Sequence, residues 1–337
     1  MNARQRIRFC TTSRGRIAYS LIGNGPVLLC DTGWVSHLEK DFDNPAVRQF
    51  FESLAAQFTV VRYDKPGSGL SDRDAVGECV DDQVRAMAAV ADEIGADNFH
   101  AFGASQGGQV AAALAARHPD RVMKLVLYGA CARGIDLAPE NLRNSLVALV
   151  GAHWGLGSKT LADVFIPDAS AEEVAMFSSQ QRAASSAEVA AALLDMYYSS
   201  DIGDLLPAVA APTLVLHREE DRATRFALGR DLASRIPGAV LVPLEGSSHL
   251  FYIGDWQAIS ELMIDFLREP SSAHAAGLSQ REREVATLVA EGLTSREIGS
   301  RLSISPRTAE THVENLRRKL GFRSRSQVAA WAAGQRS

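Results

Sequence analysis

Residues 98–107 read Asn98-Phe-His-Ala-Phe-Gly-Ala-Ser-Gln-Gly107, an apolar run that ends in Gly-Ala-Ser105-Gln-Gly. The run is typical of a buried strand, and the Ala-rich segment Gly107–His118 that follows is typical of a helix. Gly-x-Ser-x-Gly is common by chance, so its position decides its meaning. On a strand-to-helix turn, the glycines permit a tight, strained backbone that lifts the Ser105 hydroxyl clear of the sheet edge. The stretch predicts a nucleophilic serine, with an ordinary turn serine as the alternative.

Strand and helix patterns alternate on both sides of this turn. A hairpin is expected from Arg6–Thr12 and Arg16–Ile22. Buried parallel strands are expected at Val27–Asp31, Thr59–Asp64, Phe99–Ser105, Val122–Gly129, Thr213–His217 and Val240–Leu244. Helical patterns separate them at Pro45–Gln57, Cys79–Gly95, Gly107–His118, Arg225–Ile236 and Trp256–Arg268. This alternation predicts an α/β fold with a mostly parallel, doubly wound sheet. Residues 132–206 are Ala-rich and helical without a strand, which predicts a helical lid.

With this turn and this alternation, residues 6–268 resemble the α/β-hydrolase fold, in which the nucleophile, acid and base follow one another in chain order. Asp221, in His-Arg-Glu-Glu-Asp221-Arg, stands just past a predicted strand, where the fold places its acid. His249, in Gly-Ser-Ser-His249-Leu, stands just past the next one, where the fold places its base. The resemblance therefore implies a catalytic set of Ser105, Asp221 and His249.

The chemistry of such a set requires all three groups. A serine hydroxyl is a weak nucleophile until an imidazole removes its proton, and the imidazole needs a carboxylate to fix its tautomer and orientation. Two alternatives stay open. Glu220 could replace Asp221 as the acid, and His249 could be an ordinary loop histidine.

The resemblance also implies an oxyanion hole. One donor would be the backbone N–H of Gln106, and the other would come from the loop Asp31-Thr-Gly-Trp34 after the third strand. The fold commonly has His-Gly there, whereas this chain has Thr32-Gly33, so the Trp34 N–H is the expected second donor. The departure from His-Gly weakens the expectation of efficient turnover. The stretch Tyr63–Asp72 resembles a glycine-rich turn of the same fold and is expected to be structural.

A ligand pocket is expected between the carboxyl edge of the sheet and the lid. Candidate lining residues are histidines and aromatic residues of the lid and of the loop near Trp34, each of which could instead be ordinary packing: His37, His153, Trp154, Phe165, Phe177, Tyr197 and Tyr198.

Residues 278–337 carry helical patterns with local start and stop signals. Capping boxes are expected at Ser279-x-x-Glu282, Thr294-x-x-Glu297 and Ser324-x-x-Gln327, and Ser305-Pro306 suits a helix start. Gly292 and Gly321 suit helix ends. In the third helix, one stripe is expected to face inward: Ala309, Val313, Leu316 and Leu320. The opposite face then carries Arg307, Glu310, Thr311, Glu314 and Arg318, which predicts a helix-turn-helix reader of DNA.

Four strings in this tail resemble the LuxR/NarL-type DNA-binding domain over its whole length. They are Leu-Ser-Gln-Arg-Glu-Arg-Glu-Val, Glu-Gly-Leu-Thr-Ser-Arg-Glu-Ile, Ile-Ser-Pro-Arg-Thr-Ala-Glu-Thr-His-Val and Arg-Arg-Lys-Leu-Gly. The resemblance implies base-reading roles for Glu310, Thr311 and Glu314, because Glu can accept a hydrogen bond from cytosine N4. It implies phosphate contacts, which position the helix without specifying sequence, for Thr294, Ser305, Arg307, Thr308, Asn315 and Lys319.

Composition and charge support two modules with different partners. The 337 residues are 46% hydrophobic and 22% charged, which excludes a disordered chain, and no apolar run approaches the ~20 residues of a membrane helix. Residues 278–337 hold eleven Lys/Arg and six Glu, a charge of +5, whereas the rest holds 24 basic and 34 acidic residues, a charge of −10. A basic tail suggests an anionic partner, with a solvated basic face as the alternative. Residues 269–277 read as a linker.

The N-terminal residues and the cysteines bear on the location of the protein and on its need for a metal or cofactor. The N-terminus has no apolar segment behind its charges, so no signal peptide is expected. The four cysteines are widely spaced, which predicts reduced thiols, a cytoplasmic location, no metal site and no disulfide framework. No cofactor and no membrane partner are expected.

Three hypotheses for the whole chain follow. The chain resembles a LuxR/NarL-type transcription regulator with an N-terminal α/β-hydrolase-fold sensor domain, which implies double-stranded DNA, a small-molecule ligand and a homodimer as partners. It could instead be a serine hydrolase of the ester or lactone type with an accessory DNA-binding tail. In the third hypothesis the body is an inert dimerisation scaffold, which an intact Ser105–Asp221–His249 set disfavours.

Overall fold

The computed structural model describes residues 5–74, 79–268, 279–319, 325, 328–329 and 332. The chain divides into two compact units, Met1–Leu267 and Arg268–Ser337. The linker expected at 269–277 lies outside the described residues, as do Leu320, Gly321 and the capping box expected at Ser324 and Gln327.

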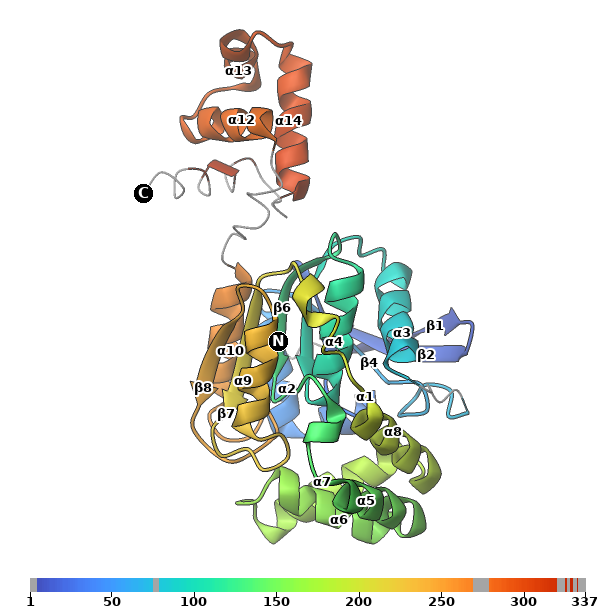
Figure 1. Cartoon of the computed structure of the whole chain (residues 1–337). Helices are drawn as coiled ribbons and strands as arrows, with labels where there is room; N and C mark the ends of the chain where they lie inside the picture. Colours follow the sequence, from blue (N-terminus) through green and yellow to red (C-terminus); the bar gives the residue numbers. More distant parts are fainter. Residues whose placement is uncertain are drawn as a thin grey trace. The chain divides into compact units, whose positions relative to one another are not determined.

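The first unit is built on an eight-stranded sheet with the order β1-β2-β4-β3-β5-β6-β7-β8 (Figure 1). β1 (Arg6–Thr12) and β2 (Gly15–Ile22) form the predicted hairpin, and β2 also pairs antiparallel with β4 (Thr59–Tyr63). The other pairs are parallel and join β3 (Val27–Asp31), β5 (Phe99–Ala104), β6 (Val122–Tyr128), β7 (Thr213–Arg218) and β8 (Val240–Leu244). The predicted α/β-hydrolase fold is confirmed.

The strand order reverses direction between β3 and β5. The chain passes from β3 to β4 on one side and later returns to place β5 on the other side of β3. In an open sheet of this kind, the crevice for a ligand forms outside the carboxyl ends of the strands at such a reversal. The loop after β3 and the turn after β5 therefore meet at this edge.

Helices cover both faces of the sheet, because side chains along each strand alternate between two apolar cores. Leu29 and its neighbours on one face pack with α3 (Val80–Glu93), α4 (Gln106–Arg117) and α9 (Phe226–Arg235). Leu28 and its neighbours on the other face pack with α2 (Pro45–Ala55) and α10 (Trp256–Arg268). Both layers are rigid supports for the loops at the carboxyl edge.

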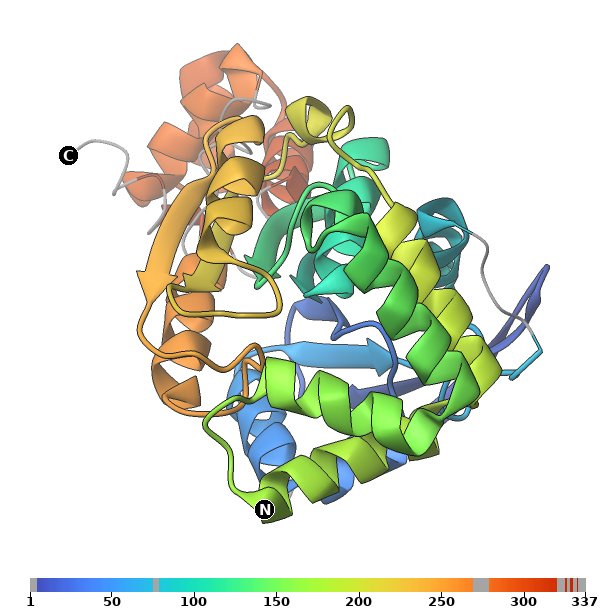
Figure 2. The same cartoon turned by 60° about the horizontal axis from the view of Figure 1, so that its bottom comes forward.

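The lid predicted at 132–206 is helical, as expected. It consists of α5 (Glu140–Ala152), α6 (Trp154–Phe165), α7 (Ala171–Ala184) and α8 (Ala187–Ser199), and an isolated β-bridge between Arg133 and Asp201 closes its base. Figure 2 brings these green and yellow-green helices forward at one end of the sheet. Val150, Leu161 and Leu193 form a small apolar core of the lid, to which Trp34 of the sheet edge contributes.

A short helix that the sequence pattern did not predict also lies near this edge. α1 (Leu38–Asp43) has only six residues, too few to show a helical period. Its first backbone N–H, from Leu38, donates to the buried carboxylate of Asp64 at 3.0 Å. In the described part of the chain, no helix is long and apolar enough to cross a membrane.

The second unit contains α12 (Gln280–Ala290), α13 (Ser295–Leu302) and α14 (Pro306–Lys319). The capping boxes at Ser279 and Thr294 are both formed, and Gly292 follows α12 with a φ of +82°, as its helix-end role requires. The inward stripe of α14 is buried at its three described positions, Ala309, Val313 and Leu316. These side chains pack with α12 and α13 into one apolar cluster.

Candidate functional site

Ser105 occupies a strained turn between β5 and α4. Its φ of 55° and ψ of −125° fall in a region that costs a non-glycine residue about 1–3 kcal/mol. Two neighbouring glycines make the turn possible. A Cβ at Gly103 would lie 2.4 Å from the carbonyl oxygen of Gly107, and a Cβ at Gly107 would lie 2.2 Å from that of Asp31. The close packing that only glycine allows therefore holds the Ser105 side chain at the carboxyl edge of the sheet.

Ser105, His249 and Asp221 form one hydrogen-bonded chain. His249 Nε2 lies 2.8 Å from Ser105 Oγ, and His249 Nδ1 lies 2.7 Å from Asp221 Oδ2. Asp221 follows β7 and His249 follows β8, so the parallel sheet delivers all three groups to one edge. Glu220, the alternative acid, is exposed, whereas Asp221 is buried.

Asp221 is held by its surroundings as an acceptor. Its Oδ1 accepts from the backbone N–H groups of Ala223 at 2.9 Å and Thr224 at 3.0 Å. Burial raises the pKa of Asp221, but the charge and hydrogen bond of His249 and the N–H of Thr224 outweigh burial and bring that pKa below its usual value. Asp221 is thus ionised where it faces the imidazole, as the orienting member of such a set must be.

A second histidine beside Asp221 was not anticipated. His217, at the end of β7, lies 3.8 Å from Asp221 Oδ2, and its own Nε2 lies 2.6 Å from the carbonyl oxygen of Thr224. Burial lowers the pKa of His217, so the ring is neutral at pH 7. Its position four residues before Asp221 on a strand end was the only available signal.

The two expected oxyanion donors lie on either side of the sheet reversal. Gln106 is the first residue of α4, where a backbone N–H has no acceptor within the helix. Trp34 follows Gly33, whose φ is +151°, in the loop after β3. The indole of Trp34 is buried and meets Trp154 of the lid edge-to-face, with ring centroids 5.9 Å apart.

A buried polar network connects the two donor segments. Lys65 Nζ donates to Asp31 Oδ2 at 2.6 Å and to Gln83 Oε1 at 2.8 Å, and Gln106 Nε2 donates to the same Gln83 oxygen at 2.9 Å. Tyr63 OH also donates to Asp31 Oδ2, at 2.6 Å. All five side chains are buried. The sequence analysis predicted a structural role for Tyr63–Asp72, but no local pattern indicates that Lys65 pairs with Asp31, the first residue of the loop that carries Trp34.

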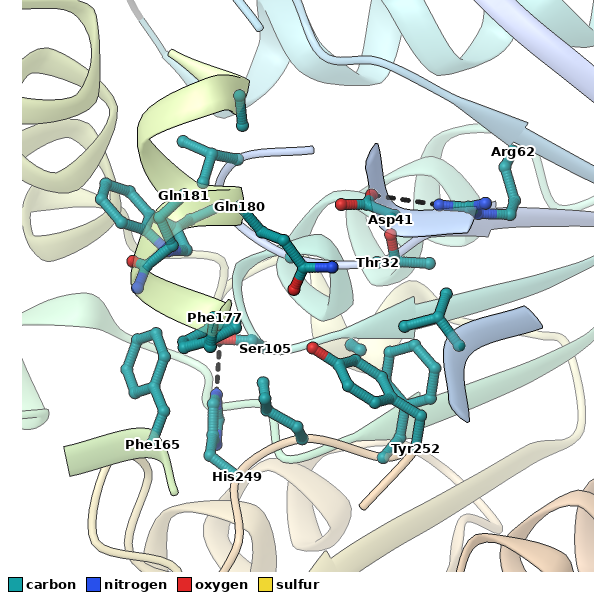
Figure 3. A pocket seen from close by; sticks show the side chains of 18 of the residues that line it. Thr32, Asp41, Arg62, Ser105, Phe165, Phe177, Gln180, Gln181, His249 and Tyr252 are labelled. Carbon is teal, nitrogen blue, oxygen red and sulfur yellow. Dashed lines mark hydrogen bonds and ion pairs between the residues drawn. The ribbon is translucent and has the colours of Figure 1, made fainter. Parts of the chain in front are cut away.

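The pocket opens in front of Ser105 (Figure 3). Its near wall holds Ser105 and His249 with the lid aromatics Phe165 and Phe177, both of which were predicted to line it. Its far wall holds groups that the sequence pattern did not single out, above all Asp41, Arg62, Gln180 and Tyr252. The cavity is therefore apolar beside the serine and polar at the other end.

The other five predicted pocket residues do not line this cavity. His37 accepts from the Lys40 N–H as the cap of α1, and the exposed His153 caps α6 in the same way. Trp154 donates through Nε1 to the Ser185 carbonyl oxygen at 3.0 Å and packs against Trp34.

The two lid tyrosines are also absent from the lining of the cavity. Tyr198 belongs to the apolar core of the lid. Tyr197 is buried, with its hydroxyl 3.7 Å from the sulfur of Cys131. Burial raises the pKa of Tyr197 well above its usual value, while the hydroxyl of Ser105 acts in the opposite direction. Tyr197 thus lies close to Ser105 although it does not line the pocket.

The outer face of α14 carries the side chains that were expected to meet DNA. Arg307, Glu310, Thr311 and Glu314 are exposed and line a shallow groove with Ser295, Arg317 and Arg325. They project away from the buried stripe because residues three and four apart share a helix face.

The remaining tail residues act first as caps and ion pairs. Thr294 caps α13, and Ser305 Oγ accepts from the Thr308 N–H at 3.0 Å at the start of α14. Asn315 accepts from Arg318 at 3.3 Å. Lys319 pairs with Glu282 Oε2 at 2.8 Å, so its charge is partly balanced within the unit.

Comparison with known proteins agrees with both units. Residues 26–255 match the family described as alpha/beta hydrolase fold, and residues 276–332 match the bacterial regulatory proteins of the luxR family. A 2-hydroxy-6-oxononadienedioate/2-hydroxy-6-oxononatrienedioate hydrolase of Burkholderia vietnamiensis is 28% identical over 277 residues, which cover 78% of this chain and 91% of that protein. The putative carbamate hydrolase RutD of Azorhizobium caulinodans is 24% identical over 233 residues, covering 66% of this chain and 86% of that protein.

Among solved structures, the enol-lactonase of Burkholderia xenovorans LB400 superposes with a TM-score of 0.66 at 24% identity. The superposition covers 78% of this chain and 100% of the enol-lactonase. The similarity at this identity establishes the fold. The chain belongs to the alpha/beta hydrolase fold family and carries, after that domain, a LuxR-type DNA-binding domain.

Proposed function

We propose that this protein is a ligand-responsive, DNA-binding transcription regulator whose α/β-hydrolase-like domain binds a small molecule and slowly hydrolyses it. The observation that carries the proposal is the hydrogen-bonded Ser105–His249–Asp221 chain opening into a lidded pocket, in a chain that also holds a LuxR-type domain. A regulator with no ligand to recognise has no physical need of such a pocket.

Ser105 is the proposed nucleophile. Its Oγ attacks a carbonyl carbon of the ligand while His249 Nε2 takes the proton, and Asp221 holds the imidazole and stabilises its charged form. The carbonyl oxygen becomes negatively charged and accepts hydrogen bonds from the backbone N–H groups of Gln106 and Trp34. His249 then protonates the leaving group, and a water molecule releases the acyl group from Ser105 by the same steps in reverse.

α14 is the proposed reading helix. Glu310, Thr311 and Glu314 would contact base edges in the major groove, since they share its outer face. Thr294, Ser305, Arg307, Thr308, Asn315 and Lys319 would contact phosphates and set the helix in register. A homodimer would place two such helices on half-sites about one helical turn apart.

Ligand binding and DNA binding are coupled in this proposal. An allosteric ligand must favour the DNA-competent arrangement by a differential free energy, usually ~1–3 kcal/mol, or about 5- to 150-fold in operator affinity. By reciprocity, operator DNA tightens ligand binding by the same factor.

The test is a titration of operator DNA into the full chain, with and without each of a panel of esters and lactones, in wild type and in Ser105→Ala. If recognition is the signal, Ser105→Ala keeps the ligand-dependent shift. If turnover generates the signal, Ser105→Ala loses it. If no compound of the panel changes the affinity of the full chain for operator DNA, the regulatory proposal is wrong.

The second candidate is a serine hydrolase of the ester or lactone type with an accessory DNA-binding tail. The strained Ser105 turn favours it, because a binding pocket alone does not require a nucleophile held at φ 55°. The related proteins named above as carbamate and dienedioate hydrolases also favour it. Fast hydrolysis of an ester, at a rate that does not change when DNA is added, would favour this candidate over the regulator.

A further inference from the structure

The far wall of the pocket contains an ion pair that the reaction at Ser105 does not use. Arg62 of β4 donates through Nη2 to Asp41 Oδ2 of α1 at 3.1 Å. The Arg62 guanidinium also stacks over the Phe51 ring, with its central carbon 4.6 Å from the ring centroid. The same guanidinium carbon lies 5.7 Å from the centroid of the Phe42 ring. Arg62 is therefore fixed in place by two rings and a charge.

Both members of this pair line the cavity, and Asp41 is the more exposed of the two. The Arg62 side chain is 2% exposed, whereas the Asp41 side chain is 23% exposed. Asp41 Oδ2 already accepts from Arg62 and from the His37 N–H at 3.1 Å. In the described part of the chain, no hydrogen bond reaches the second oxygen, Oδ1. A ligand in the pocket therefore meets a carboxylate oxygen, with the compensating cation behind it.

Two other groups of the far wall are polar and uncharged. Figure 3 shows the Tyr252 hydroxyl directed into the cavity, with Gln180 entering from the lid. Burial and the charge of Asp41 raise the pKa of Tyr252, so its hydroxyl stays protonated. Burial raises the pKa of Asp41 to about 6, against the effect of Arg62, so Asp41 is mostly ionised at pH 8.

We infer that the far wall is a subsite for a hydrogen-bond donor, a hydroxyl or an ammonium group, at the end of the ligand's acyl chain remote from the carbonyl that faces Ser105. Asp41 accepts from that donor through Oδ1. A terminal carboxylate is disfavoured, because it would meet the Asp41 carboxylate before the shielded guanidinium. The inference deepens the proposed function and rests on its assignment of Ser105 as the group that meets the ligand carbonyl.

Specificity among matched substrates tests this subsite. The full chain is assayed at pH 8 with 4-nitrophenyl esters of equal acyl length, whose acyl chains end in a methyl, hydroxyl, ammonium or carboxylate group. The value of kcat/KM is measured for each ester. A hydrogen bond to a charged group predicts that the hydroxyl and ammonium esters exceed the carboxylate ester by about 10- to 100-fold.

Asp41→Asn supplies the decisive comparison. The substitution keeps the shape of the side chain but leaves the Arg62 charge without a carboxylate, so the preference should shift toward the carboxylate ester by at least about tenfold. Asp43→Asn is the matched control. Asp43 lies on the same helix but pairs with Lys40 at the surface, and its replacement should leave the preference unchanged.

Two further measurements separate the possible failures. Should Asp41→Asn not fold, Tyr252→Phe removes one far-wall hydroxyl and should reduce the ratio of kcat/KM for the hydroxyl ester to kcat/KM for the methyl ester. Calorimetric binding of the corresponding uncleaved amides to Ser105→Ala reports the subsite without chemistry. Preferential binding of the hydroxyl amide, with no ester hydrolysis in wild type, would support the subsite and overturn hydrolysis. Equal binding and equal kcat/KM for all termini would overturn the subsite and leave Asp41–Arg62 as a structural pair.

Discussion

The pocket around Ser105 and the outer face of α14 place their functional groups in different surroundings. Asp221 and His249 are buried and come from separate loops, and each depends on the other for its position. Glu310 and Glu314 are exposed and come from one helix. A buried charge that loses its partner costs several kcal/mol, whereas an exposed substitution usually stays within about 0.5 kcal/mol. The pocket is therefore intolerant of change, while the helix face can change its sequence preference at little cost in stability.

The largest effect is expected at the base of the buried set. His249→Ala should lower fluorophosphonate labelling of Ser105 by about 10⁴-fold or more, because His249 Nε2, 2.8 Å from the serine hydroxyl, is the proposed acceptor of its proton. The measurement is the labelling rate followed by mass spectrometry. Glu220→Gln is the matched control and should label like wild type, since Glu220 is exposed beside Asp221. Normal labelling of His249→Ala would show that the set does not act as a unit.

The next effect concerns the network behind the oxyanion donors. Lys65→Met leaves the buried carboxylate of Asp31 without its cation, and the free energy of unfolding should fall by about 3–5 kcal/mol. Urea unfolding of the hydrolase-fold unit measures the loss. The double variant Asp31→Asn, Lys65→Met removes both charges and should recover part of it. A single-variant loss within 1 kcal/mol would mean that the pair is not isolated from water.

On the exposed helix, the expected effects are smaller and concern selectivity. Glu310→Ala or Glu314→Ala should change the preferred base at one position by about 1–3 kcal/mol without lowering the free energy of unfolding. Arg307→Ala should instead weaken binding to all sequences alike and reduce the slope of log affinity against log salt by about 1. Binding-site selection and salt titration distinguish the two classes. Identical sequence profiles in all variants would contradict the reading role of α14.

The smallest effect is a pH dependence of stability at Asp221. The folded-state pKa of Asp221 is depressed below the unfolded value of about 3.9, so its ionised form stabilises the fold above that pH. This contribution is lost as the pH falls through the folded-state pKa. The free energy of unfolding of wild type should therefore decline more steeply below about pH 4 than that of Asp221→Asn. Parallel curves for the two proteins would show that Asp221 is not stabilised by its partners.

The sequence predicted the elements and the order of the site residues because those signals are local. Alternating apolar runs marked the strands, and cap residues such as Ser279 and Thr294 marked helix starts. Gly103 and Gly107 marked the turn at Ser105. The parallel sheet then brings Ser105, Asp221 and His249 together, since each follows a strand that ends at the same edge.

The polar interior could not be predicted in the same way. Lys65 and Asp31 are 34 residues apart, and Arg62 and Asp41 are 21 apart, so neither pair leaves a local pattern. Five of the seven residues predicted for the pocket do not line the cavity in front of Ser105, because the residue type alone gives no indication of which side chain faces it. Phe165 and Tyr197 are equally aromatic, yet only Phe165 lines it.

One backbone contact joins the lid directly to the loop that carries the imidazole. The His249 N–H donates to the carbonyl oxygen of Phe165, the last residue of α6, at 2.7 Å. A lid movement that carries Phe165 away from the sheet must break this bond, while Asp221 still holds the imidazole through Nδ1. The position of the lid and the position of the proposed base are thereby coupled through the backbone.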